Sequence, residues 1–300
     1  MKLRGRYKIY HYNIGFINSD ISNILKDFNS LSIHWMKHKY KDRMFADPFL
    51  LNIDEDTIDV LAEESIFLHK ASSLVKLTIS KKDFHLKRRK VILHTKKHLS
   101  YPYIIRNQNN IFLLPEHIAS GKLDLYHYDE KKEICTFVKT IIEVPISDPC
   151  IYFKDGTYWL FGSKKGTDQE ELYLWQSPNI WGEYTPKEGV LIKKTKKGSR
   201  MAGEIFTYND KTYRPSQDCE SHYGAGTIIW EIKNISQTDY QEQKVKALYP
   251  TNTSPYPNGL HTINFKGNWC VIDGMRIQSD FWRGGLIRLS EKLGLNLFDH

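Results

Sequence analysis

The sequence predicts an all-β protein, a five-bladed β-propeller with a short N-terminal helix. The main observation is a hairpin pattern that recurs about every 50 residues, a period typical of four-stranded propeller blades. Five copies of this pattern account for nearly all of the 300 residues. In addition, no helix-rich segment follows a strand, which argues against a parallel α/β sheet. Because the innermost strands of a propeller start around one central channel, residues at these starts should converge in space.

The two clearest copies begin with Asp-Pro. Residues 47–51 read Asp-Pro-Phe-Leu-Leu, and residues 148–162 contain an Asp-Pro start, an apolar strand, an Asp-Gly turn and a second, aromatic strand. Weaker copies occupy residues 100–114, 203–214 and 261–273. The residues predicted to surround the channel, one from each copy, are Asp47, Tyr101, Asp148, Gly203 and His261.

The whole chain, residues 1–300, is predicted to form a single domain, with residues 1–40 as an extension and the blades starting at about residue 41. Residues 5–14 alternate like a strand, which we expect to pair with the last blade and close the ring. Residues 19–28 contain a capping residue followed by apolar residues at helical spacing, which predicts a short surface helix.

The remaining strands follow from runs of β-branched and aromatic residues between polar turns. Residues 57–62 and 74–79 are such runs in the first blade. Residues 172–175 and 227–232 are expected to be outer strands of later blades.

Composition indicates a folded protein with a substantial core, since 40% of the residues are hydrophobic and 13% are aromatic. The net charge of +8 suggests an anionic partner, but the basic clusters lack the interleaved aromatic residues of a nucleic-acid platform. We therefore expect no nucleic-acid binding and interpret these clusters as charged strand edges. The alternative is attraction to anionic lipid head groups or to a phosphorylated substrate.

Targeting signals and cofactor motifs are not evident in the sequence. Residues 1–8 lack the apolar core of a secretory signal, and no stretch approaches the roughly 20 apolar residues that span a bilayer. This predicts a cytoplasmic protein without a transmembrane segment. The four cysteines show no paired spacing for zinc, so no metal site is predicted, and no motif identifies a cofactor.

Asp47 and Asp148 are the first candidate catalytic residues. The proline after each fixes the backbone and lacks a hydrogen-bond donor, so the carboxylate should lie at the rim of the channel rather than within the ladder. The alternative is that each aspartate only starts a strand. Their equivalent positions in two blades favour a shared role.

Other acids are expected to reach the same channel. Glu63 and Glu64 end the second strand of the first blade, and Glu116 ends the second strand of the next. Breaking or making a glycosidic bond requires two carboxyl groups with different pKa values, one to protonate the leaving oxygen and one to act as base or nucleophile. Several acids around one pocket would meet this requirement.

A polar cluster at residues 213–218 includes Arg214, Gln217 and Asp218, and Arg200 is expected to enter the same blade from the channel side. Arginine forks suit carboxylate or phosphate groups, so we expect an anionic sugar or a sugar phosphate as substrate. The alternative is that Arg214 and Asp218 pair with each other to hold a bend.

His261 begins the fifth copy, and Asp273 ends it. The histidine is expected either to act in the channel, as a proton relay or as support for a central ion or water, or to be a hydrogen-bonded structural residue. Asp273, Glu64 and Tyr101 complete the residues predicted to bind substrate.

Several of these motifs together resemble a known family. The resemblance extends from about Phe45 to Arg276. The chain is similar to the propeller domain found at the N-terminus of plant glucosamine inositolphosphorylceramide transferases and as stand-alone bacterial proteins. The motifs that carry the resemblance are Met44–Phe49, Ala62–Glu64, Ser100–Tyr103, Leu114–Glu116, Arg200–Gly203, Tyr213–Asp218 and His261–Asn264.

That domain in turn resembles the five-bladed arabinanase, levansucrase and invertase superfamily of glycoside hydrolases. The resemblance implies that Asp47 is a general base or nucleophile and that Asp148 tunes pKa values or stabilises the transition state. Those hydrolases carry their proton-donating Glu immediately before the glycine that is Gly203 here, whereas this chain has Ala202. The resemblance therefore leaves Glu204, Glu116 or Glu64 to supply the acid.

Three functions are consistent with these observations. The first is a carbohydrate-active enzyme that cleaves or transfers at a glycosidic bond, with Asp47, Asp148, Glu116 and Glu204 as the catalytic candidates. The second is a glycosyltransferase, or its sugar-binding component, in surface polysaccharide or glycolipid biosynthesis. The third is a non-catalytic propeller that presents a protein-binding face.

Overall fold

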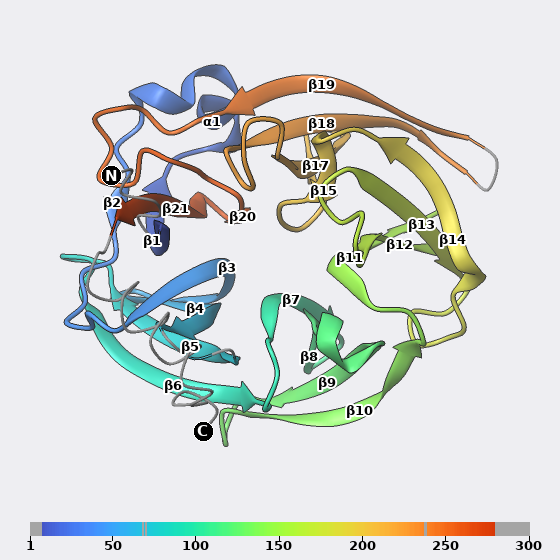
Figure 1. The fold of residues 1–300 in the computed structure, drawn as a ribbon, viewed down its shortest axis with the longest axis horizontal. Coiled ribbons are helices and arrows are strands. Elements are labelled where there is room, and N and C mark those ends of the chain that lie inside the picture. Colours follow the sequence, from blue (N-terminus) through green and yellow to red (C-terminus); the bar gives the residue numbers. More distant parts are fainter. Residues whose placement is uncertain (1–7, 68, 70, 237–238, 280–300) are drawn as a thin grey trace, which may run out of the picture.

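Five sheets surround a central axis in the computed structural model, which describes residues 8–279 except 68, 70, 237 and 238 (Figure 1). Four of the sheets have four strands, and the remaining one has a short additional strand. This arrangement confirms the predicted all-β, five-bladed propeller with one short helix. The extent of the domain over residues 1–300 stays a prediction.

Within each blade the strands run antiparallel from the axis outward. Blade one contains β3 Arg43–Ile53, β4 Thr57–Ile66, β5 Ser72–Ser80 and β6 Leu86–His94. Blade two contains β7 Ser100–Asn107, β8 Asn110–Glu116, β9 Leu123–Asp129 and β10 Ile134–Ile142. Blade three contains β11 Ile146–Lys154, β12 Thr157–Lys164, β13 Glu171–Ser177 and β14 Thr185–Lys194. Blade four contains β15 Lys197–Met201, β16 Phe206–Tyr208, β17 Lys211–Asp218, β18 Gly226–Ile235 and β19 Tyr240–Leu248.

Blade five joins the two ends of the described chain. Its inner strands are β20 Ile263–Lys266 and β21 Trp269–Ser279, and its outer strands are β1 Lys8–Asn18 and β2 His34–Trp35. Strand β1 pairs with β21 along its whole length of 11 residues. The predicted ring closure by an N-terminal strand is thus confirmed, and the residues expected to be an extension supply half of a blade.

The predicted helix is confirmed as α1 Ile21–Asp27, followed by a single 3-10 turn at Phe28–Ser30. Asp20 caps its start, because its side chain accepts a hydrogen bond of 2.8 Å from the backbone N–H of Ser22. Ile24 is buried in a cluster with residues of blades four and five. With seven residues, this α-helix of the described part is far shorter than the roughly 20 residues needed to cross a bilayer.

Three innermost strands are interrupted at the same place. Asp47, Tyr101 and Asp148 each precede a proline and have φ values of 50°, 47° and 47°. The pairing with the neighbouring strand shifts register at each of these positions. Such bulges take a residue out of the ladder and re-aim its side chain and N–H group. The recurring proline pattern therefore creates equivalent irregular corners around the axis.

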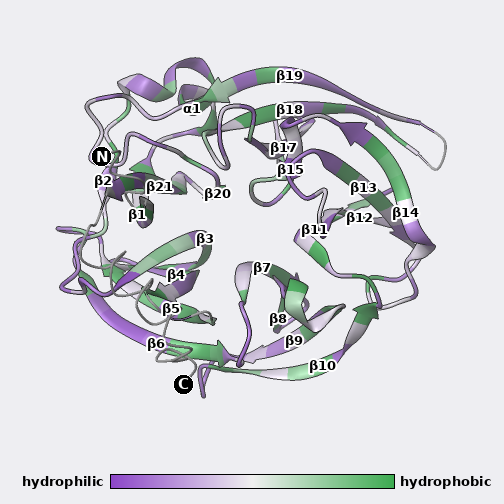
Figure 2. Cartoon of the chain, in the orientation of Figure 1, coloured by the Kyte–Doolittle hydropathy of each residue, from purple (hydrophilic) through white to green (hydrophobic). Residues whose placement is uncertain are grey.

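The core lies between adjacent blades, where the large side chains are buried, while the outermost strands carry many of the charges (Figure 2). The basic residues Lys87, Arg88, Arg89 and Lys90 lie on β6, the outermost strand of blade one. The cluster thus lies on a strand edge, as expected, while its role stays a prediction.

Candidate active site

A cavity of about 400 Å³ lies at the axis, beside the corners of blades one to three. The acidic residues that line it are Asp47, Glu63, Glu116 and Asp168, and the basic ones are His98, Lys165, Arg200 and His261. Tyr12 and Tyr223 add aromatic surface. A cavity with several acids and some aromatic surface is suited to a polar ligand such as a sugar.

Carboxylates hold the three corners in place. The backbone N–H of Asp47 donates to Asp273 Oδ2 at 3.2 Å, and that of Tyr101 donates to Asp47 Oδ2 at 3.1 Å. The N–H of Asp148 donates in the same way to Glu116 Oε2 at 3.1 Å. In each case the acid belongs to the preceding blade. The acids of the site therefore satisfy the N–H groups that the bulges release from the sheets.

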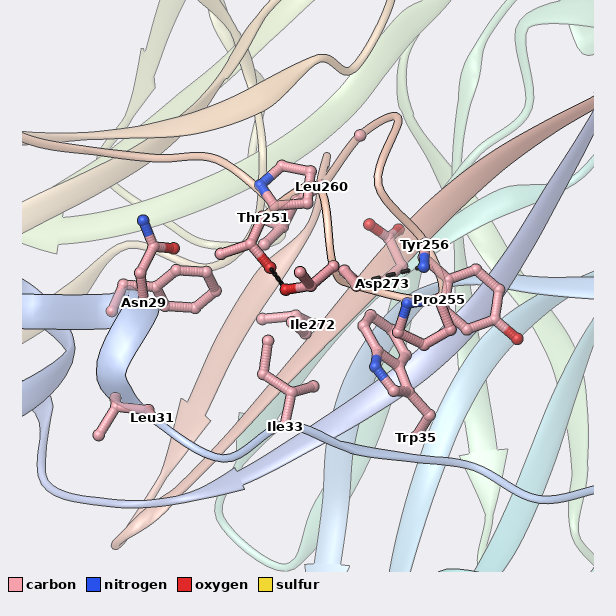
Figure 3. Close-up of a pocket in the computed structure, with 15 residues that line it drawn as sticks. Asn29, Leu31, Ile33, Trp35, Thr251, Pro255, Tyr256, Leu260, Ile272 and Asp273 are labelled. Atoms are coloured by element: carbon pink, nitrogen blue, oxygen red, sulfur yellow. Dashed lines mark hydrogen bonds between the residues drawn. The ribbon is translucent and has the colours of Figure 1, made fainter.

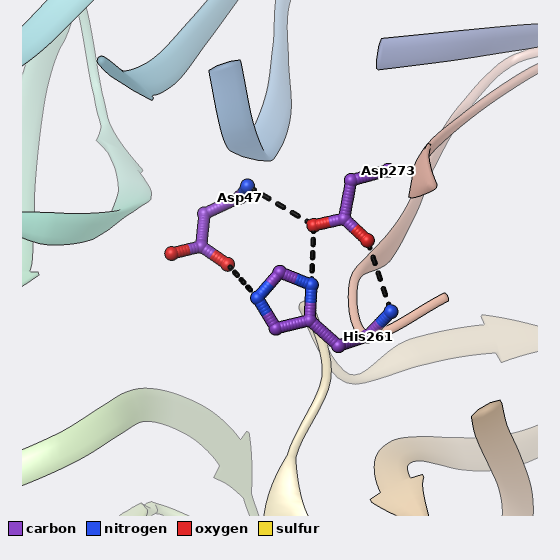
Figure 4. A group of neighbouring side chains, drawn as sticks. All are labelled: Asp47, His261 and Asp273. Atoms are coloured by element: carbon purple, nitrogen blue, oxygen red, sulfur yellow. Dashed lines mark hydrogen bonds and ion pairs between the residues drawn. The ribbon is translucent and has the colours of Figure 1, made fainter. Parts of the chain in front are cut away.

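His261 lies between two buried aspartates (Figure 4). Its Nδ1 is 2.6 Å from Asp273 Oδ2, and its Nε2 is 3.4 Å from Asp47 Oδ1. Burial alone would lower the pKa of His261, but Asp273 and Asp47 raise this pKa to about 9. The imidazole is therefore protonated at neutral pH and compensates the two carboxylates.

Asp47, His261 and Asp273 are also the residues that could hold a metal ion. One ligand atom from each lies within 4.8 Å of the others. The group is internally satisfied, however, because Asp273 accepts from the N–H groups of His261 and Thr262 and Asp47 accepts from Thr262 Oγ1. A cation would need His261 to lose its proton first.

Arg200 binds three acids at once. Its Nε donates to Asp148 Oδ2 at 2.7 Å and its Nη2 to Glu116 Oε2 at 3.1 Å, while Nη1 binds Asp168. Gln217 adds a bond from Nε2 to Asp148 Oδ2 at 2.9 Å. Burial raises the pKa of Asp148, whereas Arg200 opposes this shift. Blade four thus contributes a cation to the cavity, from a position two residues before Ala202, the residue at which the resemblance to hydrolases led us to look for an acid.

Glu63 lines the cavity in a different environment. Its Oε1 is buried and has no hydrogen-bond partner among the described residues, and His98 Nε2 lies 3.7 Å away. Burial, reinforced by the charge of Asp47, raises the pKa of Glu63 well above its usual range. Burial also raises the pKa of Asp47, but there the charge of His261 opposes the rise most strongly, so Glu63 has the weaker compensation of the two acids.

Tyr101 reaches from blade two to blade four. Its side chain is completely buried, and its hydroxyl accepts a hydrogen bond of 2.9 Å from the N–H of Gly203 in blade four. Gly203 has φ +141°, and a Cβ there would lie 2.0 Å from the carbonyl oxygen of Ile263. Only glycine fits between the phenol of blade two and the backbone of blade five.

Four of the other predicted residues lie directly behind the cavity and support its walls through hydrogen bonds. They are Asp273, Asp148, Gln217 and Tyr101. Four further predicted residues, Glu64, Arg214, Asp218 and Glu204, lie elsewhere, which corrects their expected place in the channel. Glu64 is paired with Arg89 and Arg43 on the opposite side of β4 from Glu63.

Arg214 and Asp218 are also outside the cavity, and they do not pair with each other as the alternative expected. The fully buried Arg214 makes a two-pronged ion pair with Glu242, with both bonds at 2.8 Å. Asp218 accepts a bond of 2.5 Å from the hydroxyl of Tyr249. Because these partners occupy their polar groups, both residues act within blade four.

Glu204 lies deeper in the propeller than the cavity. Its N–H donates to Asn264 Oδ1 at 2.7 Å. Burial raises the pKa of Glu204 to about 6, and Arg106 and Lys266, near the far ends of their inner strands, oppose the shift. This acid does not line the cavity with Asp47.

Sequence reasoning missed several lining residues. Tyr12 reaches the cavity because β1 closes blade five, and its ring lies 4.7 Å from that of His261. Asp168 and Lys165 come from the connection between β12 and β13, for which the sequence offers no signal. Glu63 was expected to reach the channel, but together with Glu64; the alternation along β4 requires that only one of these two neighbours faces the cavity.

A second hollow, of about 270 Å³, lies on the outer side of blade five (Figure 3). Trp35 and Tyr256 form its aromatic wall, with ring centroids 4.5 Å apart. Among the sequence-predicted site residues, only Asp273 borders this hollow.

The fold and site define a five-bladed β-propeller with an acid-lined axial cavity. The chain belongs to the family of the N-terminal domain of glucosamine inositolphosphorylceramide transferase 1, whose model matches residues 32–259. It is 30% identical over 200 residues to the protein of that name from Oryza sativa subsp. japonica, covering 61% of this chain and 26% of that protein. For the Arabidopsis thaliana protein the identity is 31% over 157 residues, covering 49% and 20%. The chain thus spans about a quarter of these relatives.

Among solved structures, the fold is similar to an α-L-arabinofuranosidase from Podospora anserina, with a TM-score of 0.54 and 10% identity over 77% of this chain and 90% of that one. It is also similar to an exo-β-1,3-galactanase from Phanerochaete chrysosporium, with a TM-score of 0.51 and 12% identity over 67% and 48%. At these identities the likeness concerns the fold alone.

Proposed function

We propose that this propeller binds a glycan in the axial cavity and acts on a glycosidic bond there. The observation that carries the proposal is the contrast between Glu63 and Asp47. Glu63 is buried with an unpartnered Oε1, whereas Asp47 accepts bonds from Tyr101 and Thr262 and faces protonated His261. Burial raises the pKa of both acids, but at Asp47 the charge of His261 and the bond from Thr262 oppose the rise, whereas the charge of Asp47 adds to the rise at Glu63. Two acids in one cavity with such unequal environments are suited to general acid–base chemistry.

In this scheme Glu63 donates its proton to the leaving glycosidic oxygen. Asp47 either activates the attacking hydroxyl or attacks the anomeric carbon itself. Arg200 holds Asp148 and Glu116 in place, so Glu116 positions the substrate at the cavity wall and Asp148 supports that wall from behind. Glu63 thereby replaces the acid expected at Ala202.

The second candidate is a sugar-binding component of a glycosyltransferase in glycolipid assembly. Family membership favours this candidate, since the relatives are named glucosamine inositolphosphorylceramide transferase. On this reading the cavity binds the sugar, and transfer requires parts of the longer relatives that this chain does not match.

The test compares Glu63→Gln with Glu204→Gln in the full chain, on oligosaccharides and on nitrophenyl glycosides. We expect Glu63→Gln to lower turnover of oligosaccharides by about 10² to 10⁴-fold, because their leaving groups need a proton. Nitrophenyl glycosides should be much less affected, since their leaving groups do not. Glu204→Gln should behave like the wild type on both.

Three results would decide the matter. Unchanged turnover of oligosaccharides by Glu63→Gln rejects Glu63 as the acid. Loss of turnover in Glu204→Gln alone assigns the role to Glu204. Calorimetric binding of sugars without turnover of any substrate favours the second candidate.

A further inference from the structure

We propose that a cation-lined hollow beside the axial cavity binds the phosphoryl group of a phosphorylated glycan. This inference rests on the proposed function, because it names the substrate class of the same site. The hollow has a volume of about 290 Å³ and is lined by the basic residues His11, His38, Lys41, Arg43 and Arg276. No carboxylate of the described residues lines it. The adjoining axial cavity, by contrast, is lined by four acids.

Tyr12 borders both spaces, so the two lie next to each other. The pairing of β1 with β21 explains this juxtaposition. His11 is directly opposite Arg276, and Tyr12 is directly opposite Met275. Successive residues of a strand face opposite sides, so the same pair of strands presents His11 and Arg276 to the hollow and Tyr12 toward His261 in the cavity. A ligand that fills both spaces carries its charged group close to the sugar.

Arg276 is the cation best placed to bind an anion. Its guanidinium lies 5.7 Å from the ring centre of Tyr256. Its Nε and Nη2 donate to the side-chain amide oxygen of Gln278 at 3.1 and 3.2 Å, a neutral partner that leaves the positive charge uncompensated and that an anion can displace. Arg43, in comparison, is compensated by Asp42 and Glu64. A planar arginine fork suits the two oxygens of a phosphate mono- or diester.

A second basic groove continues from the hollow along the edge of blade one. It has a volume of about 480 Å³ and shares His38 and Tyr40 with the hollow. Lys37, Lys39 and Lys87 add positive charge along it. Such a continuous positive surface raises the local concentration of anions and steers them toward the site.

The experiment titrates the full chain with inorganic phosphate and with glycerol 3-phosphate, using glycerol as the uncharged probe. We expect phosphate and glycerol 3-phosphate to bind, and glycerol not to bind. Arg276→Gln should weaken phosphate binding by about tenfold or more, since a charge-assisted bond is lost. Arg276→Lys keeps the positive charge but lacks the planar guanidinium, so its affinity for phosphate should lie between those of the wild type and Arg276→Gln. Lys233→Gln makes the same charge change on an exposed part of β18 and should bind phosphate like the wild type.

Phosphate binding by Arg276→Gln at the wild-type level would overturn the proposal, as would equal weakening in Lys233→Gln. A third arm uses phosphatidylcholine vesicles with and without phosphatidylinositol. Binding to the anionic vesicles without binding to either soluble phosphate would also overturn it and point to a lipid surface. Glu63→Gln should keep phosphate binding, so a failure of the catalytic assignment and a failure of this inference are distinguishable.

Discussion

At the scale of single residues, His261 determines the charge state of the axial site. It gains a proton on folding because Asp47 and Asp273 are buried beside it. Without that proton, two carboxylates would face each other in a region with little water, at a large electrostatic cost. The imidazolium therefore stabilises the site as much as it serves chemistry there.

This assignment predicts a pH dependence of stability. The pKa of His261 is about 9 in the folded state, against about 6.5 in the unfolded chain. The contribution of His261 to the free energy of unfolding is therefore fully present below pH 6.5 and is lost as the pH rises through 9. We expect the free energy of unfolding of the wild type to fall by about 3 kcal/mol over this range. Urea unfolding at a series of pH values measures it.

His261→Gln should be less stable at neutral pH and should lack this decline above pH 6.5. His94→Gln changes an exposed histidine and should keep the wild-type pH dependence. A decline of the same size in His261→Gln would show that another group carries it.

Prediction from the sequence succeeded at some residues of the site and failed at others for identifiable reasons. Asp47 and His261 follow from their positions at the starts of two copies of the pattern. Whether Glu63 or Glu64 faces the cavity depends on the bulge at Asp47, which shifts the register between β3 and β4. The position of the Arg214 side chain could not be predicted, because it is set by the ion pair with Glu242, which lies 28 residues away on another strand.

At the scale of elements, the corners formed by the Asp-Pro and Tyr-Pro pairs carry strain. A positive φ in a residue other than glycine costs roughly 1 to 3 kcal/mol and persists only where its surroundings enforce it. Here the enforcing contacts are the carboxylates of the preceding blades. The corner of blade four is built differently. Its inner strand is broken into β15 and β16, and Gly203, which adopts a positive φ, forms the corner between them.

Gly203→Ala tests this corner. The new Cβ would lie 2.0 Å from the carbonyl oxygen of Ile263, which must move for the chain to close. We expect a loss of more than about 4 kcal/mol in the free energy of unfolding, or failure to fold. Gly267→Ala is the matched control, with φ +57° and no atom within 4 Å of its Cβ.

The control should cost only about 1 to 2 kcal/mol, the price of a left-handed conformation without a clash. Equal losses in the two variants, measured by urea unfolding, would mean that the close approach to Ile263 is relieved at no cost.

The hairpins were more predictable than the strands around them. Turn residues and runs of aromatic residues predicted the inner two strands of each blade. The short β16, the break after Met201 and the pairing of β2 have no such signal, because tertiary contacts determine them.

At the scale of the whole molecule, stability depends on β1, which joins the first described residues to the last. Ile14→Pro removes a ladder bond in β1, which pairs with neighbours on both sides. We expect a loss of more than about 4 kcal/mol and a broad, less cooperative unfolding transition. The measurement is thermal unfolding followed by circular dichroism.

Val138→Pro provides the comparison, because Val138 is exposed at an irregular point of β10, the outermost strand of blade two. Its transition should stay close to that of the wild type. If both variants lost the same stability, β1 would be no more critical than an edge strand.

The phenol of Tyr101 has a consequence for how the ring of blades is held together. Because its hydroxyl accepts a bond from the N–H of Gly203, it links blade two to blade four, which are not neighbours in the ring. The side chain is completely buried, so this contact lies inside the protein. The ring is therefore joined across its interior as well as closed by the pairing of β1 with β21.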